Sequence, residues 1–389
     1  MPGFEVLGRE EQEAINEIFR INGGILFAHG FDAIRKGVYR VREFEKAFAK
    51  RMGVPHAQAV TSGTAALKVA LKALGIGQGD EVITTSFTFV ATVEAILDVG
   101  AVPVLVDIDE TLNISPTEIE KEITEKTKAI IVVHMMGAPA EMDEIMAIAK
   151  RHDLMVLEDN AQACGGTYKS RLLGTIGHMG TFSFDGGKTI TMGEGGMVVT
   201  SDENLYIRAR AYHDHGHEYS STAGRAQENA LMVGFNYRMT ELQGAIGLVQ
   251  LSKLDMILKN QRDNKKKLKS FIKDLPFEFR RLTDEDGEIG DSLIFYLPSK
   301  EQATQFAKKM IQKGLGTKNL PDAIKWHFAK HWKHMFAEHG LYHESWKSQW
   351  QKSADLLERA IALPIMVKMT DEKIEQIAET ISNIAGELL

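Results

Sequence analysis

A regular alternation of strand-like and helix-like segments between residues 57 and 212 constrains the fold more than any other feature of this sequence. Short apolar runs typical of buried strands mostly alternate with segments whose apolar residues recur at helical spacing. Successive strands joined through a helix are parallel, and a parallel sheet is covered by helices on both faces. We therefore predict an α/β fold with a mostly parallel sheet between helices. Strands are expected at residues 57–60, 81–84, 102–106, 129–134, 154–158, 180–184 and 197–200, and helices at residues 38–52, 64–74, 88–99, 142–152 and 204–212.

Further signals mark a helix start at residue 115 and a change of architecture after residue 238. Ser115-Pro116-Thr117-Glu118 has the form of a capping box with proline at the first helical position. A long amphipathic helix is predicted from residue 238 to about residue 267, and a more polar αβ segment follows it. We therefore predict a large domain, residues 1–250, with an N-terminal helical segment, and a smaller C-terminal αβ domain, residues 251–389.

Charge and cysteine content argue against several classes of protein. The net charge is -7 and the pI is about 6.0, whereas a dedicated nucleic-acid binder usually carries a basic face. Cys164 is the only cysteine, so no disulfide can form within the chain, and the N-terminal residues lack the pattern of a secretory signal. No apolar run approaches the roughly 20 residues that span a bilayer. We expect a protein of the reducing cytoplasm that binds small molecules rather than nucleic acid or membranes.

Polar and aromatic residues collect in the loops that follow the predicted strands. Ligands of such sheets gather at the carboxyl ends of the strands. Thr61-Ser62-Gly63-Thr64 lies there, at the start of a helix whose free N–H groups suit a phosphate, although serine and threonine are also ordinary helix caps. In Ser86-Phe87-Thr88-Phe89 an aromatic ring could lie flat on a planar cofactor or pack in the core.

Two adjacent acids, Glu158 and Asp159, end an apolar strand. A charge placed near the core is costly unless it is paired, so a cationic partner is expected. A protonated pyridine nitrogen, a metal ion and a salt bridge are three such partners, and the acids alone do not decide among them.

Lys188 stands in an unusual place, a glycine-rich turn between two short strands that includes Asp185-Gly186-Gly187. Most lysines lie on solvated surfaces. An amine that forms an imine must be placed accurately, which such a turn achieves. Together with Asp159 and the turn at Ser62, this placement favours a catalytic lysine over a structural one.

These segments together resemble a known family, the DegT/DnrJ/StrS group of sugar aminotransferases, which depend on pyridoxal 5'-phosphate (PLP). The similarity covers most of the chain, and five motifs occur in the same order. They are Thr61-Ser62-Gly63-Thr64-Ala65-Ala66-Leu67, Ser86-Phe87-Thr88-Phe89-Val90-Ala91-Thr92, Glu158-Asp159 with Gln162, the stretch from Ser183 to Gly196, and Gly234-Phe235-Asn236-Tyr237-Arg238-Met239. The resemblance implies a PLP transferase of fold type I whose large domain binds the cofactor.

The resemblance also implies a role for each motif. Lys188 would hold PLP as an imine and serve as catalytic acid and base, and Asp159 would pair with the pyridine nitrogen. Gln162 would contact the phenolic oxygen, and Phe89 would stack on the ring. The phosphate would be held by Gly63, Thr64 and Ser183 and by Asn236 of the partner subunit. The active unit would then be a homodimer with sites shared across the interface.

The identity of residue 188 and of its neighbours bears on the reaction. Family members with histidine at this position dehydrate or deoxygenate sugars, so lysine implies amino transfer, with L-glutamate as donor and a keto- or aldehydo-sugar of a cell-surface polysaccharide as acceptor. The common His-Pro pair is Asp185-Gly186 here, and the following asparagine is Thr189. The turn resembles that of transaminases that install the eight-position amine of 8-amino-3,8-dideoxy-manno-octulosonate in lipopolysaccharide. A nucleotide-linked 4-keto or 3-keto sugar is the alternative acceptor.

Several histidines remain to be explained. His213-Asp214-His215-Gly216-His217 could be a metal site, a loop that faces substrate through His215, or a polar surface turn; we predict no metal because clearly spaced further ligands are missing. Trp326 and His327 belong to a run with the spacing of an amphipathic helix, and they could contact substrate or pack. Arg238 could bind an acidic group or form an ion pair.

Rival functions make different predictions. A PLP-dependent sugar dehydratase would need no amino donor, and an aminotransferase for amino acids would accept no sugar. A regulatory paralogue would have no need of Lys188. A metal-dependent hydrolase built on the histidines would lose activity with a chelator.

Overall fold

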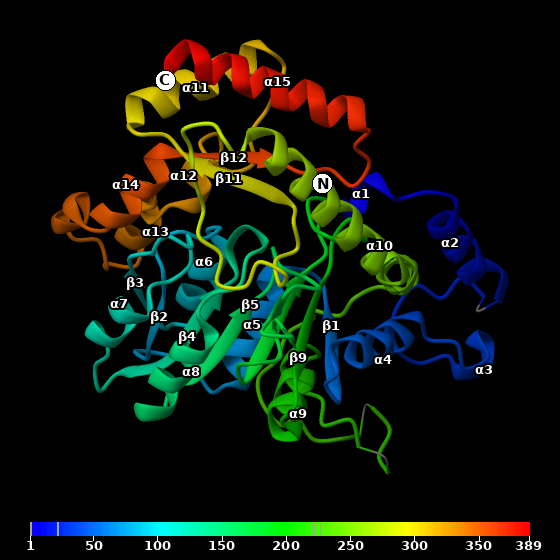
Figure 1. Ribbon diagram of the computed structural model, residues 1–389. Helices are drawn as coiled ribbons and strands as arrows, with labels where there is room; N and C mark the ends of the chain where they lie inside the picture. Colours follow the sequence, from blue (N-terminus) through cyan, green and yellow to red (C-terminus); the bar gives the residue numbers. More distant parts are fainter. Residues whose placement is uncertain (1, 22, 221, 226) are drawn as a thin grey trace.

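The structure is a computed structural model that describes residues 2–21, 23–220, 222–225 and 227–389. Its centre is a seven-stranded sheet with the strand order β1-β9-β8-β5-β4-β2-β3 (Figure 1). Each strand predicted in this part of the chain is present, with bounds that differ by at most two residues. The strands are β1 (His56–Val60), β2 (Glu81–Thr85), β3 (Val102–Val106), β4 (Thr127–Val133), β5 (Met155–Asp159), β8 (Met179–Ser183) and β9 (Gly196–Thr200).

The sheet is mostly parallel, as predicted, with one strand reversed. β9 pairs antiparallel with both β1 and β8, whereas the other neighbouring pairs are parallel. The cause is the short connection between β8 and β9, which contains no helix and so returns the chain in the opposite direction. The carboxyl ends of six strands therefore meet at one edge of the sheet, beside the turn that carries Lys188.

Helices cover both faces of this sheet. On one face lie α5 (Gly63–Ala73), α6 (Ala91–Asp98) and α9 (Glu203–Tyr212), and on the other lie α4 (Arg40–Met52), α7 (Pro116–Lys121) and α8 (Met142–Arg151). Phe44 and Phe48 of α4 meet Phe182 and Phe184 edge to face, with the rings of Phe48 and Phe182 centred 4.9 Å apart. These layers confirm the predicted α/β class. The chain also forms the N-terminal helices α1 (Pro2–Glu5), α2 (Arg9–Ile21) and α3 (Asp32–Arg35) and the small strands β6 (Thr167–Tyr168) and β7 (Arg171–Leu172).

A second, smaller sheet lies above the large one in Figure 1, beside the C-terminal part of the long helix α10 (Glu241–Ile272). Thr240 and Gln243 form a complete capping box at its start, two residues after the predicted one. Residue 250, the predicted domain boundary, lies inside this helix, which packs against both cores. The small sheet has the order β10-β11-β12 and is covered by helices; its elements are β10 (Glu278–Phe279), β11 (Ser292–Tyr296), β12 (Ala360–Pro364), α11 (Lys300–Gln312) and α15 (Asp371–Leu388).

The segment between α11 and β12 returns to the large sheet. The N–H groups of Thr88 and Val90 donate to the carbonyls of His327 and Trp326, 2.9 and 3.1 Å away. Because these carbonyls pair with another segment, the helical run predicted from residue 326 is wrong as one helix, and α6 begins at Ala91 instead of residue 88. The segment forms α12 (Ile324–His327), the 3₁₀ turn η2 (Ala329–His331), α13 (Lys333–Glu338), the 3₁₀ turn η3 (Glu344–Ser348) and α14 (Gln351–Arg359).

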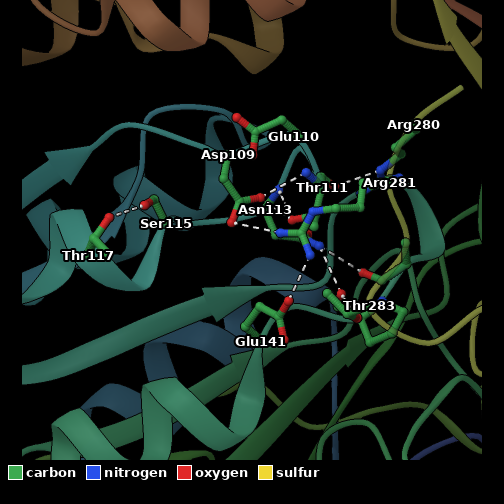
Figure 2. Close-up of polar contacts among 12 residues, drawn as sticks. Asp109, Glu110, Thr111, Asn113, Ser115, Thr117, Glu141, Arg280, Arg281 and Thr283 are labelled. Carbon is green, nitrogen blue, oxygen red and sulfur yellow. Dashed lines mark hydrogen bonds and ion pairs between the residues drawn. The ribbon is translucent and has the colours of Figure 1, made fainter. Parts of the chain in front are cut away.

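The capping box predicted at Ser115 is also wrong, although a helix does begin there. The Ser115 hydroxyl lies 3.0 Å from that of Thr117 and makes no cap bond to the helix backbone (Figure 2). Glu118 pairs instead with Lys121, at 2.7 Å. Proline at the first helical position is thus the part of the motif that marks the start of α7.

Candidate active site

A small cavity of about 90 Å³ opens at the carboxyl edge of the large sheet. It gathers residues of four post-strand segments that are far apart in the sequence, from Ser62 to Glu194. Of the predicted cofactor residues, those that line it are Gly63, Thr64, Phe89, Asp159, Gln162, Ser183 and Lys188. The sheet topology therefore brings these side chains to one place, whereas Asn236 lies elsewhere on an exposed segment.

The start of α5 forms a cradle for an anion. The Ser62 hydroxyl accepts the N–H of Ala65 at 3.1 Å, and the Ser62 carbonyl accepts that of Ala66. Within the described part of the chain, the N–H groups of Gly63 and Thr64 have no such acceptor, as is usual in a first helical turn. A Cβ on Gly63 would lie 2.6 Å from that of Ser183, so only glycine lets the helix start approach β8 so closely. A phosphate fits this cradle.

Asp159 is a buried carboxylate, 4% exposed, at the end of β5. One oxygen accepts the Thr92 hydroxyl at 2.9 Å, and the other accepts the Ala161 N–H at 3.1 Å. Burial raises the pKa of Asp159, and these two hydrogen bonds and the charge of Lys188 offset that rise only in part. None of the described residues forms an ion pair with it, so a protonated ring nitrogen would complete its surroundings.

Glu158, the neighbouring acid, is satisfied by the protein itself. Its oxygens accept the N–H groups of Gly174, Ile176 and Gly177 at 2.6 to 2.8 Å, and the His134 ring at 3.0 Å. The other ring nitrogen of His134 accepts the Ala140 N–H, so Nε2 carries the donated proton. Of the two acids, Glu158 is structural, and Asp159 is the one that needs a further partner.

Asp185 shapes the turn that carries Lys188. Its carboxylate accepts the Gly187 N–H at 2.5 Å and its carbonyl accepts the Lys188 N–H at 3.2 Å. The Lys188 Nζ lies 4.0 Å from the Asp185 carboxylate, and the lysine side chain is 19% exposed. The Gly3 N–H donates to the Lys188 carbonyl at 3.1 Å, so α1 packs against the same turn. The amine is therefore held in the cavity on a backbone fixed from both sides.

One aromatic residue, Phe89, lines the cavity, and His327 of another segment packs against it. Phe89 is 41% exposed, and its ring is centred 5.4 Å from that of His327. Burial lowers the pKa of His327, whose Nδ1 bonds the Ala323 carbonyl at 2.7 Å. Trp326 is 62% exposed. The structure thus places Trp326 and His327 beside Phe89, although they do not line the cavity itself.

The histidine-rich segment after α9 lies apart from this cavity. His213 is buried and bonds the Arg210 carbonyl and Gln58, and His217 forms an ion pair with Glu228. His215 is exposed. Arg238 pairs with Asp214 at 2.5 Å. In the part of the chain that is described, no three or more His, Cys, Asp or Glu side chains are grouped so as to hold a metal.

Sequence reasoning missed Thr92 and Gly3 as parts of the site. Thr92 stands in one of the matched motifs, and its hydroxyl also lies 2.8 Å from that of Thr88, one helical turn earlier in sequence. Two threonines four residues apart, on one face of a predicted helix, could have indicated that Thr92 belongs to the site. Gly3 gave none, because its contact with Lys188 spans most of the large domain's sequence. Among the described residues, no helix is long and apolar enough to cross a membrane.

Comparisons with known proteins identify the family to which this chain is similar. Residues 31–382 match the DegT/DnrJ/EryC1/StrS aminotransferase family. Spore coat polysaccharide biosynthesis protein SpsC of Bacillus subtilis is 35% identical over 352 residues, 89% of each chain. GDP-perosamine synthase of Escherichia coli O157:H7 is 46% identical over 229 residues, which cover 59% of this chain and 61% of that protein.

Solved structures show the same fold. The X-ray structure of an aminotransferase from Psychrobacter cryohalolentis superposes with a TM-score of 0.87 at 30% identity, covering 98% of both chains. The structure of 3-amino-5-hydroxybenzoic acid synthase gives a TM-score of 0.86 at 26% identity, covering 99% of this chain and 98% of that one. The family match extends over most of the chain, and the structural neighbours include a sugar aminotransferase solved in its PLP form. The chain therefore belongs to the DegT/DnrJ/EryC1/StrS aminotransferase family and is a PLP-dependent sugar aminotransferase of fold type I.

Proposed function

We propose that this enzyme binds PLP through Lys188 and transfers an amino group from L-glutamate to a keto- or aldehydo-sugar of a cell-surface polysaccharide, in the cytoplasm. One observation carries the site assignment: Lys188 lines the same cavity as Asp159, a buried acid that forms no ion pair with a described residue. The ring nitrogen of PLP would pair with Asp159, and its phosphate would accept the free N–H groups at Gly63 and Thr64.

The residues of the cavity then have distinct tasks. PLP, once condensed with an amine, supplies an electron sink for the carbon that loses a proton. The Lys188 Nζ is the group placed to take that proton and return it, because it lies in the cavity and its turn is fixed by Asp185. Asp159 would keep the ring nitrogen protonated, and Phe89 would pack against the ring.

For the acceptor, we favour a keto-sugar carried on a nucleotide. Support comes from two GDP-perosamine synthases that are 46% and 47% identical to parts of this chain. An octulosonate with an aldehyde at its eighth position is the second candidate, favoured by the Asp185-Gly186-Gly187-Lys188 turn. Trp326, His327, His215 and Arg238 are the proposed substrate contacts; the exposed Trp326, whose carbonyl accepts the Val90 N–H, suits a sugar face.

The acceptor can be tested directly with purified enzyme, PLP and L-glutamate. GDP-linked 4-keto sugar and 3-deoxy-octulosonate 8-aldehyde are offered separately, and 2-oxoglutarate and the aminated product are detected by mass. We expect product from the nucleotide-linked sugar. Product from the octulosonate alone would select the second candidate, and product from neither would contradict the acceptor class.

We also propose that the active unit is a homodimer in which Asn236 completes the phosphate site of the other copy. Asn236 is exposed, and its neighbours Leu231, Val233 and Phe235 are 45 to 79% exposed apolar residues, which a second copy would cover. Lys188→Ala and Asn236→Ala should each lower activity. Mixed dimers of the two variants should recover activity, because one of their two sites has both residues intact. Failure of the mixture to exceed its components would contradict the shared site.

A further inference from the structure

The turn that follows β4 has an unfavourable backbone conformation. Its residues form the 3₁₀ turn η1 (Met135–Gly137), in which Met136 has φ 52° and Gly137 has φ 76°. A side-chain-bearing residue rarely adopts the left-handed region without support from its surroundings. Asn113 supplies part of that support, since its amide oxygen accepts the Met135 N–H at 2.9 Å and its amide nitrogen donates to the Pro139 carbonyl at 3.0 Å.

Arg280, from the small domain, holds the same turn from the other side. Its guanidinium is buried and donates to the carbonyls of Thr111 at 2.6 Å, Met135 at 2.8 Å and Met136 at 3.5 Å. These acceptors are backbone carbonyls, and no carboxylate of a described residue forms an ion pair with it. Figure 2 shows Arg280 and Arg281 beside the loop that holds Asp109, Thr111 and Asn113. A buried guanidinium whose hydrogen bonds all go to backbone carbonyls holds this turn in one conformation.

The supported turn reaches the cavity through one hydrogen bond. The Met136 N–H donates to Gln162 Oε1 at 3.1 Å. A backbone N–H can only donate, so the atom facing it must be the amide oxygen of Gln162. The amide nitrogen is thereby directed away from Met136; it lies 3.4 Å from the Met135 sulfur and keeps a second proton to donate. Gln162 lines the same cavity as Asp159 and Lys188.

We propose that Arg280 is a positioning residue for the cofactor: through the Met136 turn it fixes the Gln162 amide so that an N–H is donated to the phenolic oxygen of PLP. The inference rests on the proposed binding of PLP in this cavity and on the contact between Gln162 and the phenolic oxygen that the family resemblance implies. The small domain would then influence the charge on the phenolic oxygen of PLP, although no described side chain of that domain lines the cavity.

The test is the visible absorbance of the PLP-loaded enzyme as a function of pH, recorded without amino donor. An N–H donated to the phenolic oxygen stabilises negative charge on that oxygen. Loss of this hydrogen bond should therefore raise the midpoint, the pH at which half of the absorbance change has occurred. We expect Gln162→Ala and Arg280→Met to raise it by about one pH unit, the equivalent of one hydrogen bond. Arg280→Lys, which keeps the charge but loses the planar fork, should shift it in the same direction by less.

Arg281→Gln is the matched control. Arg281 joins the same two parts of the chain through Asp109 and Glu141 but does not contact the Met136 turn, so the midpoint should stay where it is. The double variant Arg280→Met/Gln162→Ala separates positioning from a direct charge effect. If Arg280 acts through Gln162, the double variant should match Gln162→Ala alone. The cavity charges Asp159, Asp185, Lys188 and Glu194 are unchanged in all of these proteins.

Three results would overturn the inference. If Gln162→Ala shifts the midpoint and the Arg280 variants do not, or if the two shifts add in the double variant, Arg280 does not act through Gln162. If Gln162→Ala itself leaves the midpoint unchanged, the proposed contact with PLP fails as well, whereas Lys188 as the attachment site is untouched. Should Arg280→Met not fold, as judged by circular dichroism, Arg280→Lys carries the same comparison.

Discussion

Two cavities among the described residues differ in how their charged groups are paired, and the smaller one holds the groups expected of the reaction. The larger, about 840 Å³, lies between α4, α9 and the segment around Asp214. Its Asp214 is matched within the protein: burial would raise the pKa of this acid, but hydrogen bonds from Arg225, Tyr219 and Arg238 lower it well below its usual range. Glu45, another acid of the same cavity, accepts hydrogen bonds from Gln58 and the Ala59 N–H, and the cations that most lower its pKa are arginines rather than a lysine. In the smaller cavity, Asp159 forms no ion pair with a described residue, and Lys188 has only a distant partner, Asp185.

The difference teaches that a buried acid without an ion pair, when it shares its cavity with a half-buried amine, is a better guide to a reactive site than the size of the cavity. A charge whose partner is present in the fold stabilises the structure, whereas an acid and an amine that face one cavity without pairing are placed to bind a ligand. Glu158 and Asp159 repeat this contrast at neighbouring positions, since four donors satisfy the first and two satisfy the second.

The largest effect should come from Lys188→Ala. The variant loses both the attachment amine and the proton carrier, so amino transfer should fall by at least about 10³-fold. The rate of 2-oxoglutarate formation measures this loss. Lys169→Ala is the control, because Lys169 is an exposed lysine paired with Asp143, and its removal should leave the rate unchanged. Equal rates in the two variants would remove Lys188 from the mechanism.

Substitution of the two neighbouring acids should have opposite effects on the apoprotein. Asp159→Asn should weaken PLP binding by about 100-fold, because a buried ion pair loses one partner. Burial raises the pKa of Asp159, so the folded state holds this proton more tightly than the unfolded state, and ionisation of Asp159 costs stability as pH rises. The variant should therefore melt at a higher temperature than the wild-type apoprotein at pH 7.

Glu158→Gln should instead lower the free energy of unfolding by about 2–4 kcal/mol. The new amide would turn an N–H toward one of the backbone donors at Gly174, Ile176 or Gly177, leaving both groups unsatisfied. Calorimetry of the two apoproteins measures both effects. Changes of the same sign would break the contrast between a satisfied acid and an unsatisfied one.

The smallest effect concerns Glu45 and His213 in the larger cavity. Burial raises the pKa of Glu45 to about 7 from 4.5, so its ionisation lowers the free energy of unfolding as pH rises across that range. Burial lowers the pKa of His213 to about 4 from 6.5, so loss of its proton has the opposite effect between pH 4 and 6.5. Glu45→Gln removes the first contribution and should be more stable than wild type by about 1–2 kcal/mol at pH 7.5, but not at pH 4.

Urea midpoints at the two pH values measure this difference, and at both values PLP is omitted. A Glu45→Gln protein whose midpoint differs from wild type equally at pH 4 and pH 7.5 would show that this carboxyl does not titrate as described. Glu45 would then affect the free energy of unfolding through its packing and hydrogen bonds alone.

The local parts of this structure could be predicted from the sequence, and the long-range parts could not. The strands followed from their apolar runs, and Asp159 and Lys188 followed from their positions after strands and from the family resemblance. The pairing of Trp326 and His327 with the loop before α6 left no local signal, because either segment alone is compatible with a helix. Arg280 was missed for the same reason: its acceptors are backbone carbonyls, which every residue has.

Lys188 as the point of PLP attachment is the claim on which the rest depends. Borohydride reduction of the PLP-loaded enzyme fixes the cofactor to the amine that holds it, and peptide mapping by mass identifies that residue. We predict a single labelled peptide with PLP on Lys188, and no label in Lys188→Ala. PLP fixed to any other lysine, with Lys188 unmodified, would contradict the account.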